Sequence, residues 1–304
     1  MPRRVKLIFN PIANLGRAWS VASALRPIVH EFGGAEWTDT VYPTHATELA
    51  RQAAEDGYDL VIAMGGDGTM HEVLNGLMQV PQKKRPLMGI VPVGSGNDFA
   101  YACGISANPE EALRQALSGS PKPVDVGIVR DASGNTEYWT NAIGIGFDTI
   151  VTIKSRKVPI VQGFGVYLIA VLQTILFQYE PFHLKMLIDG KEVEETLLML
   201  VLMNGKREGG GFHVTPQSLP DDGLLDYLMV ERVNRLRMLR ILPEVMNGTQ
   251  ERLKDCHLGQ FRKMELHSDR PLFVHADGEI YATPTIHCNY LSLEMIQNAI
   301  QVVR

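Results

Sequence analysis

The hydrophobic positions in the first part of the chain follow two alternating patterns. Continuous apolar runs have the length of strands, and between them apolar residues recur at helical spacing, as over residues 70–77. The expected strands lie at residues 5–9, 36–41, 58–64 and 87–93. Strands that alternate with helices predict a parallel sheet with helices on both faces. We therefore expect a three-layer α/β domain over residues 1–123.

From residue 124 onward, short strand-like runs follow one another with few helices between them. The expected strands lie at residues 124–129, 138–145, 183–188, 196–203, 224–230, 261–267, 271–275 and 286–295. Asp189-Gly190 is typical of a hairpin turn, and helical spacing returns only after Gly165 and over residues 236–246. This pattern predicts an antiparallel β-sandwich domain over residues 124–304. A return of the last residues to the first domain is left open.

One apolar segment, residues 158–179, carries no charge over about the length that crosses a bilayer. Pro159 and several glycines and glutamines interrupt it, which favours a packed helix from about Gly165 to Tyr179. We therefore expect no transmembrane span. The segment could still lie near a surface that meets lipid.

Composition narrows the class of protein. At 304 residues the chain is long for one hydrophobic core, which agrees with two domains. Its formal net charge is −5, so no basic field favours a nucleic-acid partner and we expect none. Cys103, Cys256 and Cys288 lie far apart, which predicts buried thiols in a reducing compartment. The apolar run at the N-terminus is too short for a signal peptide and predicts a strand.

The stretch from Tyr58 to Gly76 carries the strongest chemical signal. Its apolar run passes through Gly65, Gly66, Asp67, Gly68 and Thr69 into a helical pattern. A helix start offers backbone N–H groups and a positive dipole end, and glycines let a phosphate approach the backbone closely. An aspartate at this point repels phosphate unless a metal ion or a donor intervenes, and this suggests Mg²⁺.

Two further loops follow strands of the same expected sheet. One begins at Asn10, and the other is a second glycine loop, Gly94-Ser95-Gly96-Asn97-Asp98. Ligands bind beyond the carboxyl ends of parallel strands, so one site could use all three loops. Ser95 offers a hydroxyl, Asn97 and Asp98 are candidate helix caps, and Asp98 could add a second carboxylate.

Two acidic motifs stand in the second part of the chain, and a turn is the simpler reading of each. Asp221 and Asp222 would also suit a hard cation that takes oxygen ligands. In an extended segment, Asp277 and Glu279 would point the same way and could act as a general base and its partner. Motifs for a P-loop, a zinc protease or a nucleophile elbow are absent, and the nine histidines form no ligand-spaced cluster.

The stretch GGDGTMHEVLNG at residues 65–76 resembles the diacylglycerol kinase catalytic family, and within it the bacterial lipid kinases that are similar to sphingosine and ceramide kinases. The likeness extends through NPIANLGR (10–17), PVGSGNDFA (92–100), SLPDDGLLD (218–226) and DGE (277–279). GGDG alone is shared with NAD kinases and phosphofructokinases, whereas the five blocks together are highly specific. They span nearly the whole chain.

The resemblance implies that ATP binds between an α/β domain and a β-sandwich domain. The implied nucleotide contacts are Asn10, Pro11, Ile12, Ala13, Asn14, Thr40, Gly65, Gly66, Asp67, Gly68, Thr69, Met70, His71, Gly94, Ser95 and Asn97. This chain departs from the family at Ser95, where threonine is usual, and at Ala13-Asn14, where small residues and glycine are frequent.

The resemblance also implies a structural Mg²⁺. Its ligands would be Asp222 and the main-chain carbonyls of Leu219 and Leu224. Asp67, Asp98 and Asp222 would form a carboxylate–water–Mg²⁺ network. Catalysis would then combine this network with an acidic proton acceptor.

Glu279 is the general base that the resemblance implies, with Asp277 assisting. The expected function is ATP- and Mg²⁺-dependent transfer of a phosphoryl group to a lipid hydroxyl, with diacylglycerol giving phosphatidic acid. We expect a cytoplasmic enzyme that works at the inner face of the membrane without spanning it. A soluble-metabolite kinase of the NAD kinase type and a non-catalytic nucleotide or lipid sensor are the alternatives. A homodimer is left open.

Overall fold

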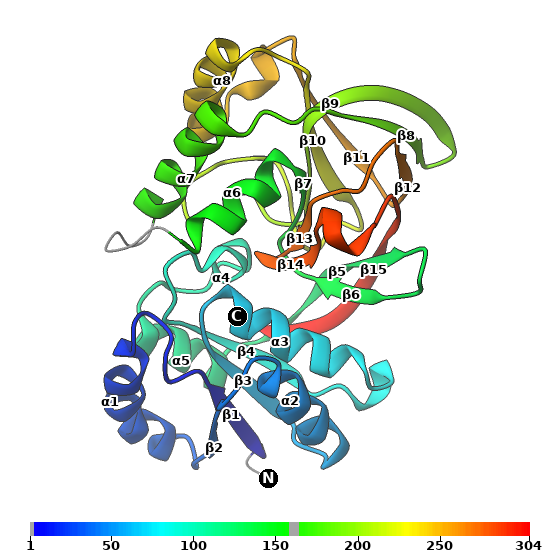
Figure 1. The fold of residues 1–304 in the computed structure, drawn as a ribbon. Coiled ribbons are helices and arrows are strands. Elements are labelled where there is room, and N and C mark those ends of the chain that lie inside the picture. The colour runs from blue at the N-terminus through cyan, green and yellow to red at the C-terminus, as the bar shows by residue number, and fades with distance from the viewer. Residues whose placement is uncertain (1–2, 158–163) are drawn as a thin grey trace. The chain divides into compact units, whose positions relative to one another are not determined.

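The computed structural model describes residues 3–157 and 164–304. The chain forms two compact units, one of residues 1–126 with 297–304 and one of residues 127–296. The last strand, β15 (Tyr290–Val303), ends in the first unit, where Val302 pairs with Met88 in parallel. Figure 1 shows the elements of each unit.

The first unit is an α/β domain built on parallel strands. Its elements are β1 (Val5–Phe9), α1 (Arg17–Glu31), β2 (Glu36–Asp39), α2 (His45–Glu55), β3 (Leu60–Gly65), α3 (Asp67–Met78), η1 (Gln82–Lys84), β4 (Leu87–Pro92), α4 (Asp98–Ala102) and α5 (Pro109–Ser118). The strands run in the order β4-β3-β1-β2 and are parallel to one another. Every residue of β1 and β3 is buried, as expected of strands covered on both faces.

Helices cover this sheet in pairs, α1 with α5 and α2 with α3 (Figure 1). Residues such as Leu25 of α1 and Leu113 of α5 join Leu7 and Ile62 of the sheet in one core cluster. The predicted three-layer α/β architecture is therefore confirmed. Parallel strands place the segments that follow β1, β3 and β4 at one edge of the sheet.

The second unit is an antiparallel β domain with helices on one side. Its elements are β6 (Thr136–Trp139), β7 (Ala142–Gly146), α6 (Phe147–Ser155), α7 (Phe164–Phe177), β8 (Phe182–Ile188), β9 (Lys191–Met203), β10 (Leu225–Glu231), α8 (Arg235–Asn247), η2 (Gln250–Arg252), β11 (Cys256–Phe261), β12 (Lys263–Ser268), β13 (Val274–Ala276), β14 (Glu279–Ala282) and η3 (Pro284–Ile286). β5 (Pro121–Asp131) enters it from the first unit and pairs with β6.

The long strand β9 joins the two layers of the sandwich. Its first half pairs with β8, and its second half pairs with β7 on one side and β10 on the other. Side chains of β8, β12 and β15 meet those of β7, β9 and β10 in a core cluster that encloses Phe261 and Leu202. The predicted antiparallel sandwich is confirmed, as is the hairpin turn at Asp189-Gly190, where both residues have positive φ.

The other face of the β7-β9-β10 layer carries the helices α6, α7 and α8, which share a second core cluster with it. The sequence predicted α8 and the helix after Gly165, but α6 was missed. Five β-branched residues in succession, residues 149–153, disfavour a helix by propensity, and burial of Ile150 and Val151 overrides that preference.

Strand boundaries differ from prediction at several places. The predicted strand 138–145 is divided into β6 and β7, and the predicted strand 261–267 corresponds to β12. The strands β11 and β14 were not predicted, and β15 begins and ends later than the predicted strand 286–295. Residues 158–163 of the predicted apolar segment lie outside the described residues. Within the ranges that the structure describes, no helix is both long and apolar enough to cross a bilayer.

The three cysteines are free and buried, as predicted. Burial raises the pKa of the Cys256 thiol to about 11 and also raises the pKa of Cys288. Below that pH the Cys256 thiol stays protonated, so at about pH 8 only about one molecule in a thousand carries its thiolate.

We expect iodoacetamide to leave the folded protein unmodified and to alkylate all the cysteines in denaturant, as measured by mass spectrometry. Rapid stoichiometric alkylation of Cys256 in the folded protein would contradict this.

Candidate functional site

The two glycine loops of the first unit pack against each other. A Cβ atom on Gly94 would lie 2.4 Å from Cα of Gly66, and a Cβ atom on Gly65 would lie 2.2 Å from the Thr69 hydroxyl oxygen. Neither distance is compatible with a side chain, so glycine is required for this packing whether or not a ligand is bound. The N-terminus of α3, capped by Gly66, has no side-chain cap, which leaves a helix start suited to an anion.

Asp67 joins these loops through its carboxylate. One oxygen accepts the N–H of Asn97 at 2.7 Å, and the other accepts the N–H groups of Asp98 at 2.7 Å and Phe99 at 3.3 Å. The sequence suggested that Asp67 needs a metal ion or a donor beside an anion site, and the structure supplies donors. Asp67 therefore holds the start of α4 in place.

Asp98 lies beside Asp67, as the sequence predicted for a shared sheet edge. The space beside Gly96 is bounded by an oxygen of each carboxylate, 2.8 Å and 3.3 Å from where a Cβ atom would stand. Asn97 has positive φ, and its side-chain oxygen accepts the N–H of Gly94 at 3.0 Å. Ser95 is exposed at the tip of this loop.

The first loop begins at the end of β1. The N–H of Asn10 donates to the carbonyl of Met64 in β3, and the Asn10 side chain accepts the N–H of Ile12 at 3.1 Å. Asn14 and Leu15 both have positive φ, a conformation that costs free energy in residues other than glycine. Thr40 lies at the same edge, because its N–H donates to the carbonyl of Phe9 at the end of β1.

The side chains of two predicted nucleotide contacts, Met70 and His71, are buried. Met70 is fully buried, and His71 is 3% exposed and lies 3.3 Å from the Asn75 amide nitrogen. Only their main-chain atoms remain as candidates for a ligand. The predicted site residues of the first unit are otherwise brought together at the carboxyl edge of the sheet.

In the second unit, Asp277-Gly278 is a two-residue hairpin turn between β13 and β14. Both residues have positive φ, and Ala276 pairs with Glu279. The simpler interpretation of this motif, a turn, is therefore confirmed, and the alternative in which Asp277 and Glu279 point the same way from an extended segment is wrong. A turn places the two carboxylates differently, and they have different partners.

The Asp277 carboxylate holds the segment between β6 and β7. It accepts the N–H groups of Thr140, Asn141 and Ala142 at 2.8, 2.8 and 3.0 Å, and the Thr140 hydroxyl at 3.1 Å. These bonds explain why the predicted strand 138–145 is broken at this point. Asp277 is thus a structural anchor of the turn that carries Glu279.

Glu279 lies in the open, with its side chain 51% exposed. One carboxylate oxygen is 2.8 Å from the guanidinium of Arg156, which also donates to the carbonyl of Gly278 at 2.7 Å. Arg156 stands at the end of α6, so this helix orients the acidic side chain. The pair is solvated, and we attribute little stability to it.

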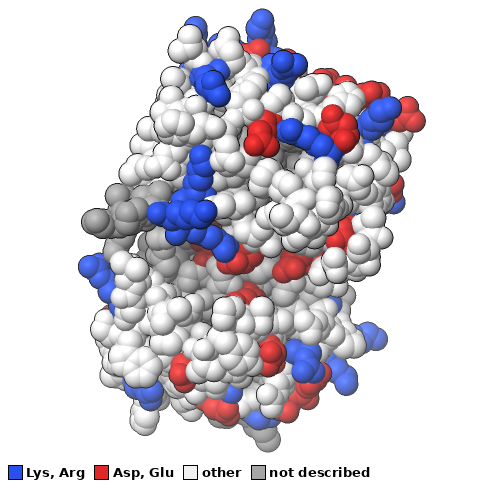
Figure 2. Space-filling model, viewed as in Figure 1, with Lys and Arg blue, Asp and Glu red and all other residues white. Residues whose placement is uncertain are grey.

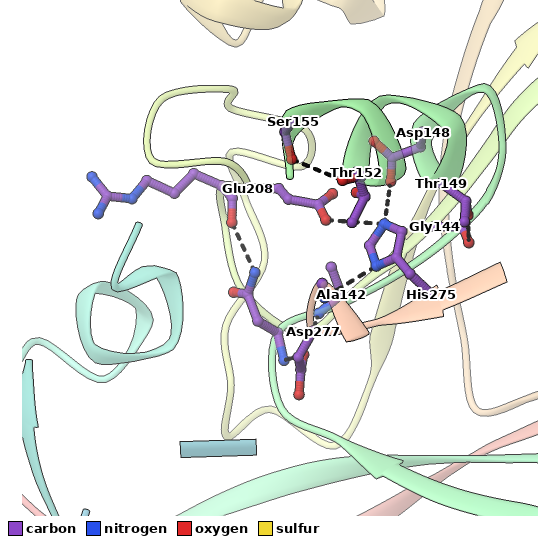
Figure 3. Close-up of polar contacts among 12 residues, drawn as sticks. Ala142, Gly144, Asp148, Thr149, Thr152, Ser155, Glu208, His275 and Asp277 are labelled. Atoms are coloured by element: carbon purple, nitrogen blue, oxygen red, sulfur yellow. Dashed lines mark hydrogen bonds and ion pairs between the residues drawn. The ribbon is translucent and has the colours of Figure 1, made fainter. Parts of the chain in front are cut away.

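A histidine that sequence reasoning passed over lies behind this turn. His275 is fully buried, and its Nδ1 accepts the N–H of Gly278 at 3.2 Å (Figure 3). Its Nε2 lies 2.8 Å from Asp148 and 3.3 Å from Glu208. The bond at Nδ1 assigns the proton to Nε2, which therefore donates to the carboxylates. A Cβ atom on Gly144 would lie 2.0 Å from Asp148 and 2.2 Å from His275, so only glycine fits beneath them.

Asp148, Glu208 and His275 have ligand atoms within 4.8 Å of one another, and they could in principle hold a metal ion. A metal on Nε2 would move the proton to Nδ1, where it would oppose the N–H of Gly278. Imidazole is also a poor ligand for Mg²⁺. We therefore interpret the three side chains as a hydrogen-bonded cluster. Long gaps in the sequence separate them, so no spacing rule could have found them.

An apolar cavity opens beside this cluster. Its walls come from α6, α7 and α8, from β9 and β10, and from the loop at residues 208–214. Val171 and Ile175 of α7, with Ile241 of α8, are among its lining residues. Asp148 and Glu208 also line it, with Thr152. The cavity is therefore apolar along its walls and acidic where it meets the cluster.

The predicted Mg²⁺ ligands lie in the loop before β10. Asp222 is exposed, its side chain accepts the N–H of Leu224 at 3.0 Å, and Leu219 is 45% exposed. An exposed carboxylate among main-chain carbonyls is an oxygen-only donor set that fits a hard cation. The neighbouring Asp221 could add a second carboxylate.

The hydrogen bonds of Asp67 can be tested by stability. In Asp67→Asn the amide keeps one acceptor oxygen and presents an NH₂ group to the N–H groups at the start of α4. We expect a loss of about 1–3 kcal/mol in the free energy of unfolding, measured with urea. Asp39→Asn, at an exposed carboxylate at the end of β2, is the matched control and should change little. Equal stability of the two variants would show that Asp67 does not clamp the loops.

Comparison with known proteins agrees with both halves of the chain. Residues 4–129 match the diacylglycerol kinase catalytic domain, and residues 141–304 match the YegS C-terminal NAD kinase beta sandwich-like domain. A protein of Chromohalobacter salexigens named probable lipid kinase YegS-like is 36% identical over 80% of this chain and 75% of its own length. The diacylglycerol kinase of Bacillus subtilis is 29% identical over 91% of this chain and 90% of its own.

A solved structure shares the fold over nearly the whole length. It is a proposed diacylglycerol kinase from Bacillus anthracis, with a TM-score of 0.80 and 25% identity, covering 99% of this chain and 96% of that one. The glycine loops, the acidic turn and these matches agree, and the chain belongs to the diacylglycerol kinase catalytic-domain family that includes the YegS-like lipid kinases.

Proposed function

We propose that this protein transfers the γ-phosphoryl group of ATP to the hydroxyl of diacylglycerol, giving phosphatidic acid. Family membership supports the kinase class. The observation that most supports a lipid acceptor is the apolar cavity of the second unit, whose acidic end is hydrogen-bonded through His275 to the turn that carries Glu279. A water-soluble acceptor would have no use for such a cavity.

The walls of the cavity suit an acyl chain. Each methylene group that leaves water for an apolar environment contributes about 0.8 kcal/mol to binding. Val171 and Ile175 of α7 face the cavity, so the helix that the sequence singled out as apolar forms part of its wall. We assign this cavity to one acyl chain of the acceptor.

The acidic end of the cavity favours an uncharged head group. Asp148 and Glu208 can accept hydrogen bonds from a glycerol hydroxyl, whereas a phosphate-bearing head would meet two carboxylates of its own sign. This favours diacylglycerol over phosphatidylglycerol as the acceptor. A sphingoid base is the competing acceptor, because its amine is compatible with the negative charge of Asp148 and Glu208.

The loops of the first unit would hold the nucleotide. The N–H of Gly94 already donates to the Asn97 side chain. The uncapped start of α3 after Gly66 offers backbone N–H groups to the phosphates, and the exposed Ser95 adds a hydroxyl donor. Fixed donors of this kind stabilise the charge on a phosphoryl group in transfer.

Asp222, with the carbonyls of Leu219 and Leu224, would hold Mg²⁺. When bound, the ion would supply positive charge that offsets the charge of the phosphates. Asp67 keeps the second glycine loop in register. We propose that Asp67 and Asp98 also contact the Mg²⁺ held by Asp222 through water molecules.

Glu279 is the proposed proton acceptor. It is exposed to an incoming hydroxyl, and Arg156 fixes its orientation. Asp277 assists by holding the turn, because its carboxylate is engaged with four donor groups of residues 140–142. We further propose that the enzyme works in the cytoplasm at the inner face of the membrane, where ATP and lipid are both present.

The direct test is phosphorylation with labelled ATP and Mg²⁺ on a panel of acceptors in mixed micelles. Diacylglycerol, phosphatidylglycerol, a sphingoid base and NAD are compared, with a mixed lipid extract as a further substrate. We expect label in phosphatidic acid. Label confined to phosphatidylglycerol, to the sphingoid base or to NADP would reject the proposed acceptor, and no labelled product from any of them would reject the kinase.

Loss of the base should separate chemistry from nucleotide binding. In Glu279→Gln we expect phosphoryl transfer to fall by about 10²-fold or more, while ATP binding measured by calorimetry stays unchanged. Glu194→Gln is the matched control, since Glu194 is also an exposed, ion-paired glutamate of this unit. Near-normal turnover of Glu279→Gln would assign the base elsewhere.

A larger side chain inside the cavity should weaken binding of the acyl chain without changing the binding of ATP. In Val171→Trp we expect KM for long-chain diacylglycerol to rise about tenfold or more, while binding of ATP is kept. Leu187→Trp adds the same side chain at an exposed position of β8 in the same unit and should leave KM unchanged. If the two variants behave alike, the acyl chain does not occupy this cavity.

A further inference from the structure

The helices that wall the cavity are apolar on their outer faces as well. On α7, Val171 and Ile175 point inward and line the cavity, while Leu172, Leu176 and Phe177 are 37%, 56% and 75% exposed. This helix carries no charged residue. A helix of a water-soluble surface would instead be polar on its outer face.

The outer face of α8 repeats this pattern. Met238, Ile241 and Val245 are buried and line the cavity, while Leu236 and Leu239 are 79% and 40% exposed. Burial against the unit accounts for the first set of residues. Packing within the unit does not explain why the exposed residues Leu236 and Leu239 are apolar.

The two outer faces are neighbours. The end of α7 and the start of α8 are linked where the guanidinium of Arg235 lies 5.9 Å from the ring of Tyr179. α7 and α8 also pack against each other and lie on the same side of their unit (Figure 1). We call the exposed side chains of Leu172, Leu176, Phe177, Leu236 and Leu239 the α7–α8 apolar surface.

Positive charge borders this surface. Arg232, Arg235 and Arg240 are exposed at or beside α8, whereas Arg237 is paired with Asp255 at 2.5 Å. In Figure 2, Lys and Arg side chains lie over α8, above an uncharged surface over α7. Exposed leucines and phenylalanine bordered by arginines are the pattern of a segment that lies in the interface of an anionic membrane.

We propose that the α7–α8 apolar surface inserts into the head-group region of a membrane that contains anionic phospholipid. The leucines and Phe177 would enter the acyl boundary, and the three arginines would meet lipid phosphates. Because the inner faces of the same helices wall the cavity, this orientation brings the cavity next to the lipid phase. This role of the cavity rests on the lipid kinase function proposed above, but the docking surface itself does not.

Vesicle sedimentation without nucleotide tests the docking surface. The intact protein should bind vesicles of phosphatidylcholine with phosphatidylserine and bind pure phosphatidylcholine vesicles at least about tenfold more weakly. The double variants Leu236→Ser/Leu239→Ser and Leu176→Ser/Phe177→Ser should each lose about tenfold or more in affinity. Arg235→Glu/Arg240→Glu should weaken binding most at low salt.

Ile286→Ser and Leu187→Ser are the matched controls, because both residues are exposed, apolar and in the same unit but lie on other elements. They should bind vesicles like the intact protein. If the leucine variants also bind normally, or if the controls lose as much, the proposal is overturned. Sedimentation velocity adds one more outcome: a dimer that Leu236→Ser/Leu239→Ser dissociates would assign this surface to a second copy of the chain.

Activity separates this proposal from the kinase assignment. With short-chain diacylglycerol dispersed as monomers, the leucine variants should turn over like the intact protein, and with vesicles they should lose activity in proportion to binding. Equal losses on both substrates would mean that the surface supports the fold, not docking. If no lipid is phosphorylated but vesicle binding follows the predicted order, the docking surface stands and the kinase function falls.

Discussion

Main-chain N–H groups that lie outside helices and strands need acceptors, and aspartate side chains supply them at the second glycine loop and beside the acidic turn. Asp67 accepts three N–H groups at the start of α4, and Asp277 accepts three more between β6 and β7. An ionised carboxylate offers several acceptor positions on one short side chain, so it can hold a segment that no regular pairing holds. The glycine loops and the acidic turn keep their shapes because of these two side chains.

Much of the fold could be predicted from sequence. Buried parallel strands read as continuous apolar runs, and Asp189-Gly190 marks a hairpin because both positions need positive φ. The helix α6 was missed, since its β-branched residues favour strands and only packing against the sheet makes it a helix. Strand limits near Thr140 were wrong because the partner that breaks the strand, Asp277, is far away in sequence.

The candidate site was predictable only where its residues are local. The loops at Asn10, Gly66 and Gly94 share an edge because they follow parallel strands, and this needs no knowledge of distant contacts. The cluster of Asp148, Glu208 and His275 has no such rule, as its members come from three elements far apart in sequence. At Asp277 the simpler interpretation, a turn, is the correct one, but spacing alone could not exclude an extended segment in which Asp277 and Glu279 point the same way.

His275 links the acidic end of the cavity to the turn that carries Glu279, two parts of the second unit that protein engineering would aim to change separately. Its two ring nitrogens bond to the carboxylates at the end of the cavity and to the backbone beside Glu279. A redesign that replaces Asp148 or Glu208 to admit a bulkier head group would also alter the support of the acidic turn. Under the proposed function, acceptor choice and turnover would therefore be coupled, and useful new variants would need compensating substitutions at both ends of one imidazole ring.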